Sequence, residues 1–561
     1  MKLQSIRKDN LMKKRILVAL VSVFLFSGFL TRDNDIYFEI NKSIDIFGRV
    51  YREVALNYVD DLNPQNFMIA GIEGMLSSLD PYSNFIDVSE QKDIEIITKG
   101  KYGGIGATIG VRNSEVTVVD LIEGFSAQRQ GMRIGDVITK INEQVISKEN
   151  YDRLGDYLKG DVGTNLSVTV KRENNSDPIV FNLVREEIEI KNVPFYGFVP
   201  ENGSNAYLKL SGFSQSAGEE VKKALLNMKA QKEIKSLVID LRGNPGGLLD
   251  AAIDVCEKFL QKGQLIVSVK GRDSVNVKNH YSLEEPILPD AKIVLLIDEG
   301  TASAAEIVAG ALQDHDRAIV VGTNSFGKGL VQTIIPLPFN NSLKLTTARY
   351  YTPSGRSIQK INYSTKGKIF EGSHALIKKE FKTDKQRLVY SAGGIMPDTL
   401  VKKVSGSQIV QRLLAEGMFF RFATHFSNQN ISLDYSTVSQ QKMISEFSAY
   451  IQNAGFDFVS KSEKLIDQLK ESAKEEKLDT KFVTQLDNMK KEFDASHSSE
   501  IQKYKDEIYN LIREELIARS GGKEKRLKEA LLFDKQFETS LSIFNNPKAY
   551  GSILSNTARQ N

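Results

Sequence analysis

A lysine flanked by glycines is the sharpest chemical signal in the chain. Lys328 stands between Gly327 and Gly329, shortly after an apolar run at 318–321 that predicts a buried strand. Glycine neighbours allow close backbone approach. Apolar surroundings would lower the pKa of the ammonium from ~10.4 to about 7–8, at a cost of roughly 4 kcal/mol. Such a lysine can be the general base for a serine nucleophile; the alternative is a surface lysine in a turn.

A serine upstream is a candidate nucleophile. The predicted strand 292–297 is followed by Gly300–Ser303, and a helix rich in small residues is expected from Ala304. Ser303 would then stand at the helix N-terminus, where unpaired N–H groups and the helix dipole favour a developing oxyanion. This is the logic of a nucleophile elbow, although G-x-S-x-G is absent. An ordinary N-cap serine is the alternative.

The stretch Asp240–Leu248 is a third place where a predicted strand meets a predicted helix through glycines. Its backbone N–H groups could complete an oxyanion hole beside that of Ala304. Taken alone, the stretch would be only a tight turn.

Residues 322–329 also satisfy the phosphate-loop template G-x-x-x-x-G-K. Gly329, however, stands where that motif needs a hydroxyl for Mg²⁺. Residues 330–336 are rich in β-branched side chains and end in proline, so they predict a strand and not the helix that the template requires. A nucleotide site is therefore disfavoured.

The elements that must position these residues change character along the chain. Apolar residues recur at helical spacing near the N-terminus, whereas the runs 236–241 and 292–297 are mostly apolar, as buried parallel strands require. We expect the charged C-terminal helices to pack on the core or on a second subunit. The predicted fold class is a mixed α+β and α/β multidomain protein, with a helical N-terminal region (33–98), a β-rich domain (99–187), an α/β core (188–404) and a helical C-terminal extension (405–561).

The composition excludes several classes of protein. Of the 561 residues, 41% are hydrophobic and 26% are charged, which excludes a disordered chain and a multi-span membrane protein. The 74 Lys and Arg against 71 Asp and Glu give no electrostatic case for nucleic acid. The single Cys256 excludes an intrachain disulfide framework and a cysteine zinc site, and the histidines lack metal-ligand spacing. No metal or organic cofactor is implied.

The residue pattern at the N-terminus predicts an export signal. Lys13–Arg15 precede about 15 apolar residues that end near Leu30, short of the ~20 needed to span a bilayer. This pattern predicts a secretory signal, and the positive charges before it favour export of the rest of the chain. The cleavage site is poor because bulky Phe29 follows Gly28, so a cleaved signal peptide (1–32) and a retained membrane anchor both stay open. A buried helix of a cytosolic protein is the alternative.

In their order along the chain, Asp240–Leu248, Gly300–Glu306 and Phe326–Gln332 resemble segments of the carboxyl-terminal processing peptidases, also called tail-specific proteases. The resemblance covers roughly residues 36–404. It implies a serine endopeptidase with a Ser-Lys dyad, in which Ser303 is the nucleophile, Lys328 the general base and Gln332 the residue that positions the lysine. Further matching segments are Gly310–Asp314, Leu343–Arg356, Gly393–Asp398 and Leu79–Ser83, the last with Tyr82 where the family more usually has histidine.

The resemblance also suggests the remaining parts of the site. Residues 328 and 332 would face the same side of an extended strand. The amides of Gly246 and Ala304 are the candidates for the oxyanion hole, with Gly247 as a substitute. Glu306 and Asp314 would be either supporting groups or helix-surface carboxylates.

The β-rich domain resembles a PDZ domain. A peptide would add as a strand to an exposed sheet edge while loop amides hold its terminal carboxylate. We expect this binding to shift an inactive arrangement of the dyad toward an active one. Gly131–Ile138 matches the turn and strand of protease-linked PDZ domains, and the peptide-binding loop would consist of Tyr102, Gly103, Gly104, Ile105 and Gly106.

The sequence therefore predicts an exported serine endopeptidase, periplasmic or anchored in the inner membrane facing the periplasm. It would act on protein or peptide substrates with accessible C-termini and not on nucleic acid, and its C-terminal helices would form a homodimer or bind an adaptor. A catalytically silent PDZ scaffold is the alternative, but it has no reason to retain Ser303, Lys328 and Gln332 together. A Ser-His-Asp hydrolase is weaker still, because His315 ends the helical region that begins at Ser303.

Overall fold

The computed structural model describes residues 31–555 apart from 89, 273–275, 364–373, 376, 403–406, 431–434, 457–460 and 477. Residues 1–30, with the basic and apolar segments of the predicted export signal, lie outside the described residues. Among the helices of the described part, none combines the length and apolarity needed to cross a bilayer. The mixed α+β and α/β multidomain class predicted from the sequence is confirmed.

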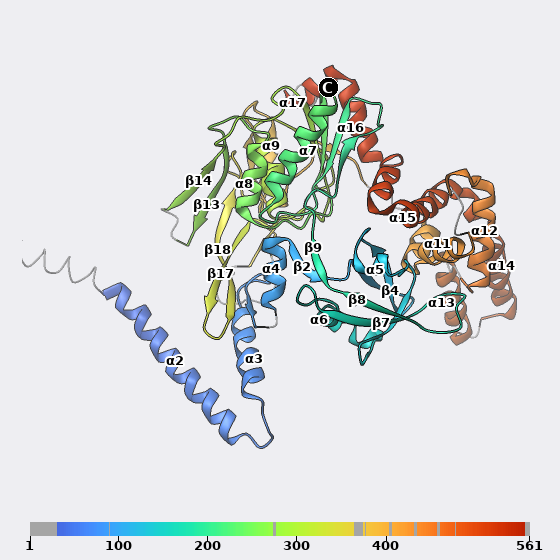
Figure 1. The fold of residues 1–561 in the computed structure, drawn as a ribbon, viewed down its shortest axis with the longest axis horizontal. Coiled ribbons are helices and arrows are strands. Elements are labelled where there is room, and N and C mark those ends of the chain that lie inside the picture. The colour runs from blue at the N-terminus through green and yellow to red at the C-terminus, as the bar shows by residue number, and fades with distance from the viewer. Residues whose placement is uncertain are drawn as a thin grey trace, which may run out of the picture.

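A six-stranded sheet forms the α/β core (Figure 1). Its order is β10-β11-β12-β15-β16-β23, in which β10 is antiparallel to its neighbour and the other pairs are parallel. The central strands are apolar along their length because helices cover both faces. The bounds are β10 (Phe195–Phe198), β11 (Asn205–Lys209), β12 (Ser236–Asp240), β15 (Lys292–Ile297), β16 (Ile319–Gly322) and β23 (Thr399–Leu400).

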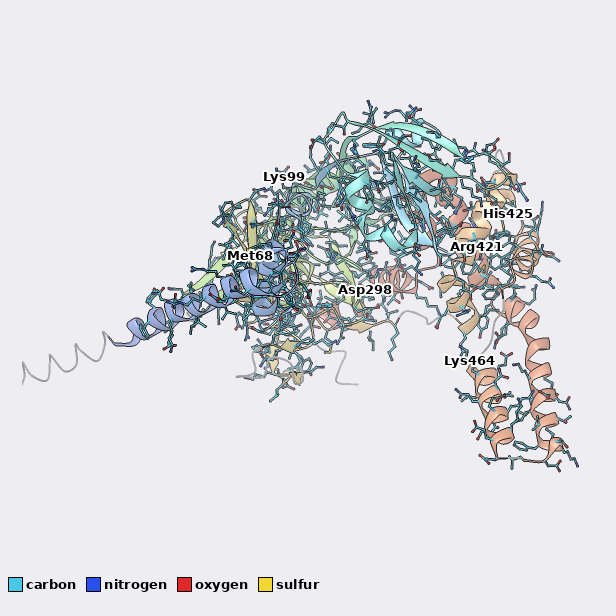
Figure 2. The ribbon with its side chains drawn as sticks, turned by 90° about the horizontal axis from the view of Figure 1, so that it is seen from below. Met68, Lys99, Asp298, Arg421, His425 and Lys464 are labelled. Carbon is cyan, nitrogen blue, oxygen red and sulfur yellow. The ribbon has the colours of Figure 1, made fainter. Side chains whose placement is uncertain are left out.

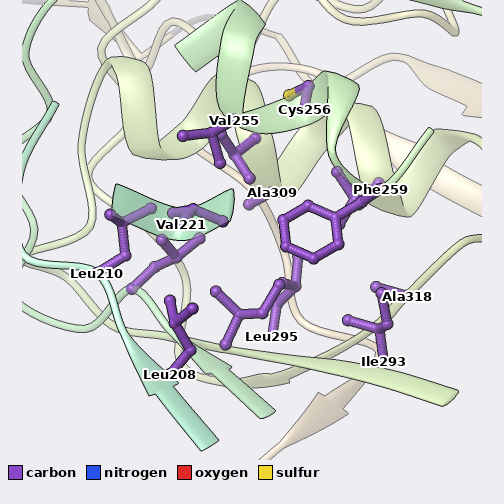
Figure 3. Packing of buried hydrophobic residues seen from close by; sticks show 14 of the residues in the cluster. Leu208, Leu210, Val221, Val255, Cys256, Phe259, Ile293, Leu295, Ala309 and Ala318 are labelled. Carbon is purple, nitrogen blue, oxygen red and sulfur yellow. The ribbon is translucent and has the colours of Figure 1, made fainter. Parts of the chain in front are cut away.

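One face of this sheet packs against α7 (Ala217–Gln231), α8 (Leu249–Glu257) and α9 (Ala304–Asp314). Leu208 and Leu295 from the sheet meet Val255, Phe259 and Ala309 from the helical layer in one buried cluster (Figure 3). The helices predicted after the 240–248 stretch and from Ala304 are α8 and α9, so the alternation of strands and helices there is confirmed.

The opposite face is covered by the last two helices of the chain, α16 (Lys535–Asn545) and α17 (Pro547–Leu554). Phe537 and Phe544 are buried there against Val238 of β12 and Val294 of β15. The sheet is thus the middle of three layers, and its second helical layer comes from the C-terminal extension. For these two helices the expectation that the extension packs on the core is confirmed.

A second, antiparallel sheet lies beside the core, in the order β1-β18-β13-β14 with β17 paired to β18. The strand β17 confirms the prediction of a strand after Lys328. The strand β1 was not predicted, because its pairing with β18 bridges distant parts of the chain and leaves no local signal. The bounds are β1 (Asn84–Ile86), β13 (Leu265–Gly271), β14 (Val277–Tyr281), β17 (Leu330–Leu337) and β18 (Asn341–Tyr351), with the small pairs β19 (Ile361–Asn362) and β20 (His374–Ala375), β21 (Glu380–Lys382) and β22 (Leu388–Tyr390).

The N-terminal region contains the predicted helices, α2 (Thr31–Asn57), α3 (Pro64–Leu76) and α4 (Gln91–Lys99). The long helix α2 extends away from the rest of the molecule (Figure 1). The Asn63 side chain caps α3 by accepting the N–H of Asn66 at 3.1 Å. The segment after α3 turns and becomes β1, which brings it to the edge of the second sheet.

The β-rich domain has the sheet order β3-β4-β5-β7-β8, with β6 paired to β5 and a separate β2-β9 ribbon. In this sheet β3 is an edge strand. The bounds are β2 (Lys101–Gly104), β3 (Ala107–Arg112), β4 (Glu115–Leu121), α5 (Ser126–Arg129), β5 (Val137–Ile141), β6 (Gln144–Val145), η1 (Lys148–Arg153), α6 (Leu154–Leu158), β7 (Asn165–Lys171), β8 (Ile179–Val184) and β9 (Glu186–Glu189).

The C-terminal helices before α16 form a separate packed unit. Their apolar residues, Phe422 and Phe447 among them, make one buried cluster. His425 Nδ1 lies 2.8 Å from Glu173 Oε1 of the β-rich domain, and α13 and α14 project from the unit as a hairpin (Figure 2). The bounds are α10 (Gln408–Ala415), α11 (Met418–Gln429), η2 (Tyr435–Thr437), α12 (Gln440–Asn453), α13 (Lys461–Glu475), α14 (Thr480–Lys503) and α15 (Lys505–Leu531).

Candidate active site

One buried carboxylate joins the two segments that carry the predicted dyad. Glu306, in the first turn of α9, accepts the N–H of Ser303 and the N–H of Lys328 with the same oxygen, Oε2, each at 2.9 Å. Its other oxygen accepts the N–H of Gly327 at 2.7 Å and the hydroxyl of Ser325. The serine loop and the lysine loop, predicted separately from the sequence, therefore meet at one side chain.

The four hydrogen-bond donors around Glu306 indicate the protonation state that its carboxyl group takes. Its side chain is 0% exposed, and this burial raises its pKa to about 7, although the four hydrogen bonds oppose the rise. An ionised carboxylate only accepts, whereas a protonated one must donate. Four donors on two oxygens therefore match the ionised form. The alternative that Glu306 is a helix-surface carboxylate is wrong.

Asp314, at the other end of α9, is also buried. Its Oδ1 binds Arg356 Nη2 at 2.8 Å, and its Oδ2 accepts the N–H of Ser354 at 3.0 Å. Its position is therefore not that of a helix-surface carboxylate either. The contacts tie the end of α9 to the segment after β18.

Ser303 has an unusual backbone conformation at the start of α9. Its φ is +55° and its ψ is −117°, a region that residues other than glycine rarely occupy. The carbonyl of Ser303 accepts the hydroxyl of buried Tyr350 at 3.2 Å, and its N–H is held by Glu306. Strain of this kind at a strand-to-helix turn is what the comparison with a nucleophile elbow leads one to expect.

The candidate oxyanion loop lies directly against this serine. A Cβ added to Gly246 would lie 2.8 Å from Ser303 Cβ and 2.9 Å from the amide nitrogen of Ala304, and the φ of Gly246 is +99°. Only glycine fits there. The N–H of Gly246 donates to Asn244 Oδ1 at 2.9 Å, so this amide is engaged inside its own loop. Gly247 is equally confined, since a Cβ there would lie 2.4 Å from the carbonyl oxygen of Phe213.

Lys328 lies just before β17 and points toward the N-terminal region. Its Nζ is 4.3 Å from the ring centroid of Tyr82, whose turn is held by Asp80. Burial lowers the pKa of Lys328 to about 8, and the charge of Lys344 lowers it further, while Asp80 and Glu306 oppose the shift. The direction and size of this shift agree with the range expected from the sequence.

Gln332 does not lie on one regular strand with Lys328, as was assumed from the sequence. The strand β17 begins at Leu330, after Lys328, and its register shifts between Val331 and Gln332. The side-chain amide of Gln332 donates to Thr346 Oγ1 of β18 at 3.2 Å. The assumption of one regular strand from 328 to 332 is therefore wrong, because Lys328 and Gly329 precede the strand.

His315 is placed away from the serine. It is the C-cap of α9, 12 residues and therefore about 18 Å along the helix from Ser303. Its Nδ1 lies 2.8 Å from Asp384 Oδ2 and its Nε2 lies 2.7 Å from the carbonyl oxygen of Leu265. These contacts argue against a triad that pairs Ser303 with His315.

The predicted peptide-binding loop leads into the edge strand β3. Its first half is already paired, with Gly103 opposite Glu187 of β9, and Ile105 is buried in the domain core. The glycines are needed for close approach, since a Cβ on Gly103 would lie 2.0 Å from the carbonyl oxygen of Gly160. The sequence did not single out Tyr151, whose hydroxyl donates to the carbonyl of Ile109 on β3 at 3.2 Å.

This fold and site define a class, a serine peptidase that carries a PDZ domain. Residues 204–365 match "Peptidase family S41", 117–172 match "PDZ domain", and 409–544 match "Probable PDZ-protease, C-terminal helical domain". The chain is 40% identical over 323 residues to a "Carboxy-terminal-processing protease" of Bartonella bacilliformis, covering 57% of this chain and 73% of that protein. The chain belongs to this family of carboxy-terminal-processing serine proteases.

Other relatives are more distant. A "Probable CtpA-like serine protease" of Staphylococcus aureus is 34% identical over 313 residues, which span 55% of this chain and 61% of that protein. Among solved structures, the "photosystem II D1 C-terminal processing protease" is 24% identical, with a TM-score of 0.35, and the match covers 63% of this chain and 86% of that one.

Proposed function

We propose that the protein is an exported endopeptidase that cleaves peptide bonds with a dyad of Ser303 and Lys328. The observation that carries this proposal is the shared oxygen of Glu306, which bonds the amides of both residues. The lowered pKa of Lys328, about 8, supports it, because roughly a tenth of the amine is then uncharged at pH 7, far more than for an ordinary lysine.

In the proposed reaction the free amine of Lys328 takes the proton of Ser303 Oγ as the oxygen attacks the scissile carbonyl. The oxyanion is stabilised by the amide of Ala304 and by that of Gly246, which must first leave Asn244 Oδ1, with the amide of Gly247 as a substitute. The lysine then protonates the leaving amine, and water hydrolyses the acyl-enzyme. Gln332 would orient the amine, by a contact formed when the substrate is bound.

The amine of Lys328 must turn away from the ring of Tyr82 to reach the serine. A lysine side chain has four rotatable bonds, which allow its amine to change position. We propose that the contact with Tyr82 belongs to a resting arrangement and that a peptide on the PDZ domain favours the active one. Equal peptidase rates with and without a peptide bound to the PDZ domain would contradict this.

Substrate recognition would use the free edge of β3. A C-terminal tail would pair with this strand in place of the hydroxyl of Tyr151, with its carboxylate held by amides of the 102–106 loop. The proposal also includes the domain boundaries 33–98, 99–187, 188–404 and 405–561. It places the protein in the periplasm or on the periplasmic side of the inner membrane. The C-terminal helices would form a homodimer or bind an adaptor. Fractionation of cells that express the protein with or without residues 1–30 tests the export, which should be lost in the shortened protein.

The decisive experiment is digestion of an unfolded protein, with product ends read by mass spectrometry. The wild type should cleave it, whereas Ser303→Ala and Lys328→Ala should each lose at least about 10³-fold in rate. Lys223→Ala, on the exposed side of α7, is the matched control and should cleave at the wild-type rate. A wild type that only binds peptides would favour the silent scaffold, and a fully active Lys328→Ala would eliminate the Ser-Lys dyad.

A further inference from the structure

The loop that approaches Ser303 is held from outside the α/β core. Arg242 lies in the 240–248 loop, and its guanidinium Nη1 reaches two side chains at the start of α16: Asp534 Oδ2 at 2.6 Å and Gln536 Oε1 at 3.0 Å. The other side of the guanidinium binds Asp240, with Nε to Oδ1 at 3.0 Å and Nη2 to Oδ2 at 2.7 Å. Arg242 therefore joins the end of β12 to the last part of the chain.

The partners on α16 are themselves fixed. Asp534 is the N-cap of α16, and its Oδ1 accepts the N–H of Gln536 at 2.9 Å and of Phe537 at 3.2 Å, which leaves Oδ2 for Arg242. Gln536 is 6% exposed, and its Nε2 donates to the carbonyl of Val401 at 2.8 Å. Phe537 packs edge-on against Tyr207 of β11. The two polar side chains thus stand on a helix that is anchored in the sheet.

The same loop continues from Arg242 to the nucleophile. Gly243 donates its N–H to Asp298 Oδ1 at 2.8 Å, and buried Asn244 holds both the N–H of Gly246 and, through its carbonyl, the N–H of Ala302. Gly246 then packs on Ser303. A displacement of Arg242 would be passed along these few residues to the backbone that faces the serine.

The charges balance across this junction. Arg242 and Lys209 meet the carboxylates of Asp240 and Asp534, and Lys209 Nζ also donates to the carbonyl of Arg242 at 2.7 Å. Asp240 is 2% exposed, and Arg242 holds its pKa well below the usual range. If Asp534 loses its charge, Arg242 still has Asp240, so the loop keeps its inner attachment and loses only the outer one.

We propose that Asp534 and Gln536 are positioning residues of the peptidase. Through Arg242 they hold the 240–248 loop so that the backbone of Gly246 stays against Ser303. The C-terminal extension thereby contributes to the geometry of the oxyanion hole, although it supplies no group that touches the substrate. This inference rests on the proposed dyad at Ser303 and Lys328.

The test compares kcat, KM and the melting temperature of full-length Asp534→Asn with those of the wild type on an unstructured peptide. Asparagine also caps helices well, so α16 should persist while the ion pair is lost. We expect kcat to fall about 10- to 100-fold, as small misplacements in active sites do, with KM and the melting temperature nearly unchanged. Asp479→Asn, at the N-cap of α14 in the projecting hairpin, is the matched control and should leave kcat unchanged.

A second variant tests whether Arg242 is the link. Gln536 Oε1 already contacts the nitrogen that Asp534 binds, so Gln536→Glu in the Asp534→Asn background returns a carboxylate to it. Glutamate cannot donate to the carbonyl of Val401 as the amide does, so the regain should be partial. We expect this double variant to regain at least threefold in kcat. An unchanged kcat in Asp534→Asn, a loss explained by a smaller folded fraction, or a loss without any regain would each overturn the inference. Failure of the proposed dyad can be told apart from failure of this inference, because Ser303→Ala would then cleave as fast as the wild type.

Discussion

The candidate active site is held by two anchors that differ in origin. The inner anchor, Glu306, belongs to α9, is fully buried, and bonds amides that lie within the same α/β core. The outer anchor, Asp534 with Gln536, belongs to α16 and reaches Arg242 across 294 residues of sequence. The inner anchor gathers the proposed nucleophile and base, whereas the outer anchor steadies the loop beside them.

The two anchors differ in how far water can replace the hydrogen bonds that they make. The side chains of Arg242 and Asp534 are each 19% exposed, so water can take over part of their bonding. Glu306 is sealed from solvent, and a missing acceptor there leaves a buried N–H unpaired. We therefore expect changes at the inner anchor to cost more, in both stability and activity, than changes at the outer one.

Glu306→Gln should have the largest effect. The amide nitrogen of glutamine would face two N–H or O–H donors where an oxygen now accepts them, at a cost of about 1–3 kcal/mol in the free energy of unfolding. We expect kcat to fall by at least about 10³-fold, more than in Asp534→Asn, because the segment 325–328 loses an acceptor whichever way the amide lies. Urea unfolding and peptide cleavage measure the two effects. Glu299→Gln, at an exposed position just after β15, is the control and should change neither quantity. Equal losses in Glu306→Gln and Asp534→Asn would contradict the expected difference between the two anchors.

The pH profile should separate the two anchors. The pKa of Lys328 is lowered to about 8 in the folded protein, so the uncharged amine, and with it kcat/KM, should increase as the pH rises through about 8 and then level off. Asp534→Asn should lower the plateau without moving its midpoint, since the outer anchor does not act on the amine. A midpoint shift of about half a pH unit or more in this variant would mean that the outer anchor also tunes the base.

Tyr82→Leu should move that midpoint downward. The ring of Tyr82 faces the ammonium of Lys328 and stabilises its charged form. Such contacts are worth about 0.5–2 kcal/mol, or up to about one pKa unit, and leucine keeps most of the burial without the attraction. Tyr82→Phe keeps the ring and should leave the midpoint in place. An upward shift in Tyr82→Leu would show that the ring acts mainly by excluding water.

Lys344→Met should have the smallest effect, of the opposite sign. The positive charge of Lys344 on β18 lowers the pKa of Lys328, so its removal should raise the midpoint by a few tenths of a pH unit. High salt should raise the wild-type midpoint and leave that of Lys344→Met nearly fixed, since it screens the same charge. A downward shift on removal of Lys344 would contradict this assignment.

Local patterns were enough to predict the elements that carry the site. The apolar runs at β12 and β15, and the small-residue helix after Ser303, are each encoded by a few neighbouring residues, so strand, turn and helix could be predicted in order. The direction of the pKa shift of Lys328 was predicted, but the local sequence also allowed a surface lysine in a turn, and the ring that faces the amine comes from distant Tyr82.

Other features depend on partners that are distant in sequence. Nothing near Asp534 indicates that its carboxylate faces Arg242, and the strand β1 exists only because β18 offers it an edge. The register shift beside Gln332 belongs to the pairing of β17 with β18, and the sequence of one strand alone does not indicate it. Glu306 was noticed, but its four bonds could not be foreseen, since they require the serine loop and the lysine loop to converge on it.

The closing helices α16 and α17 have a practical consequence for anyone dividing this chain. A fragment that stops where the peptidase-like sequence ends would leave Phe195, Val238 and Val294 bare to water, because Phe537 and Phe544 would be missing from above them. Such a fragment should aggregate or stay partly unfolded. A minimal peptidase must therefore be assembled from two stretches of the gene, the central segment and the terminal helical pair, joined by a short designed linker or supplied as two complementing polypeptides.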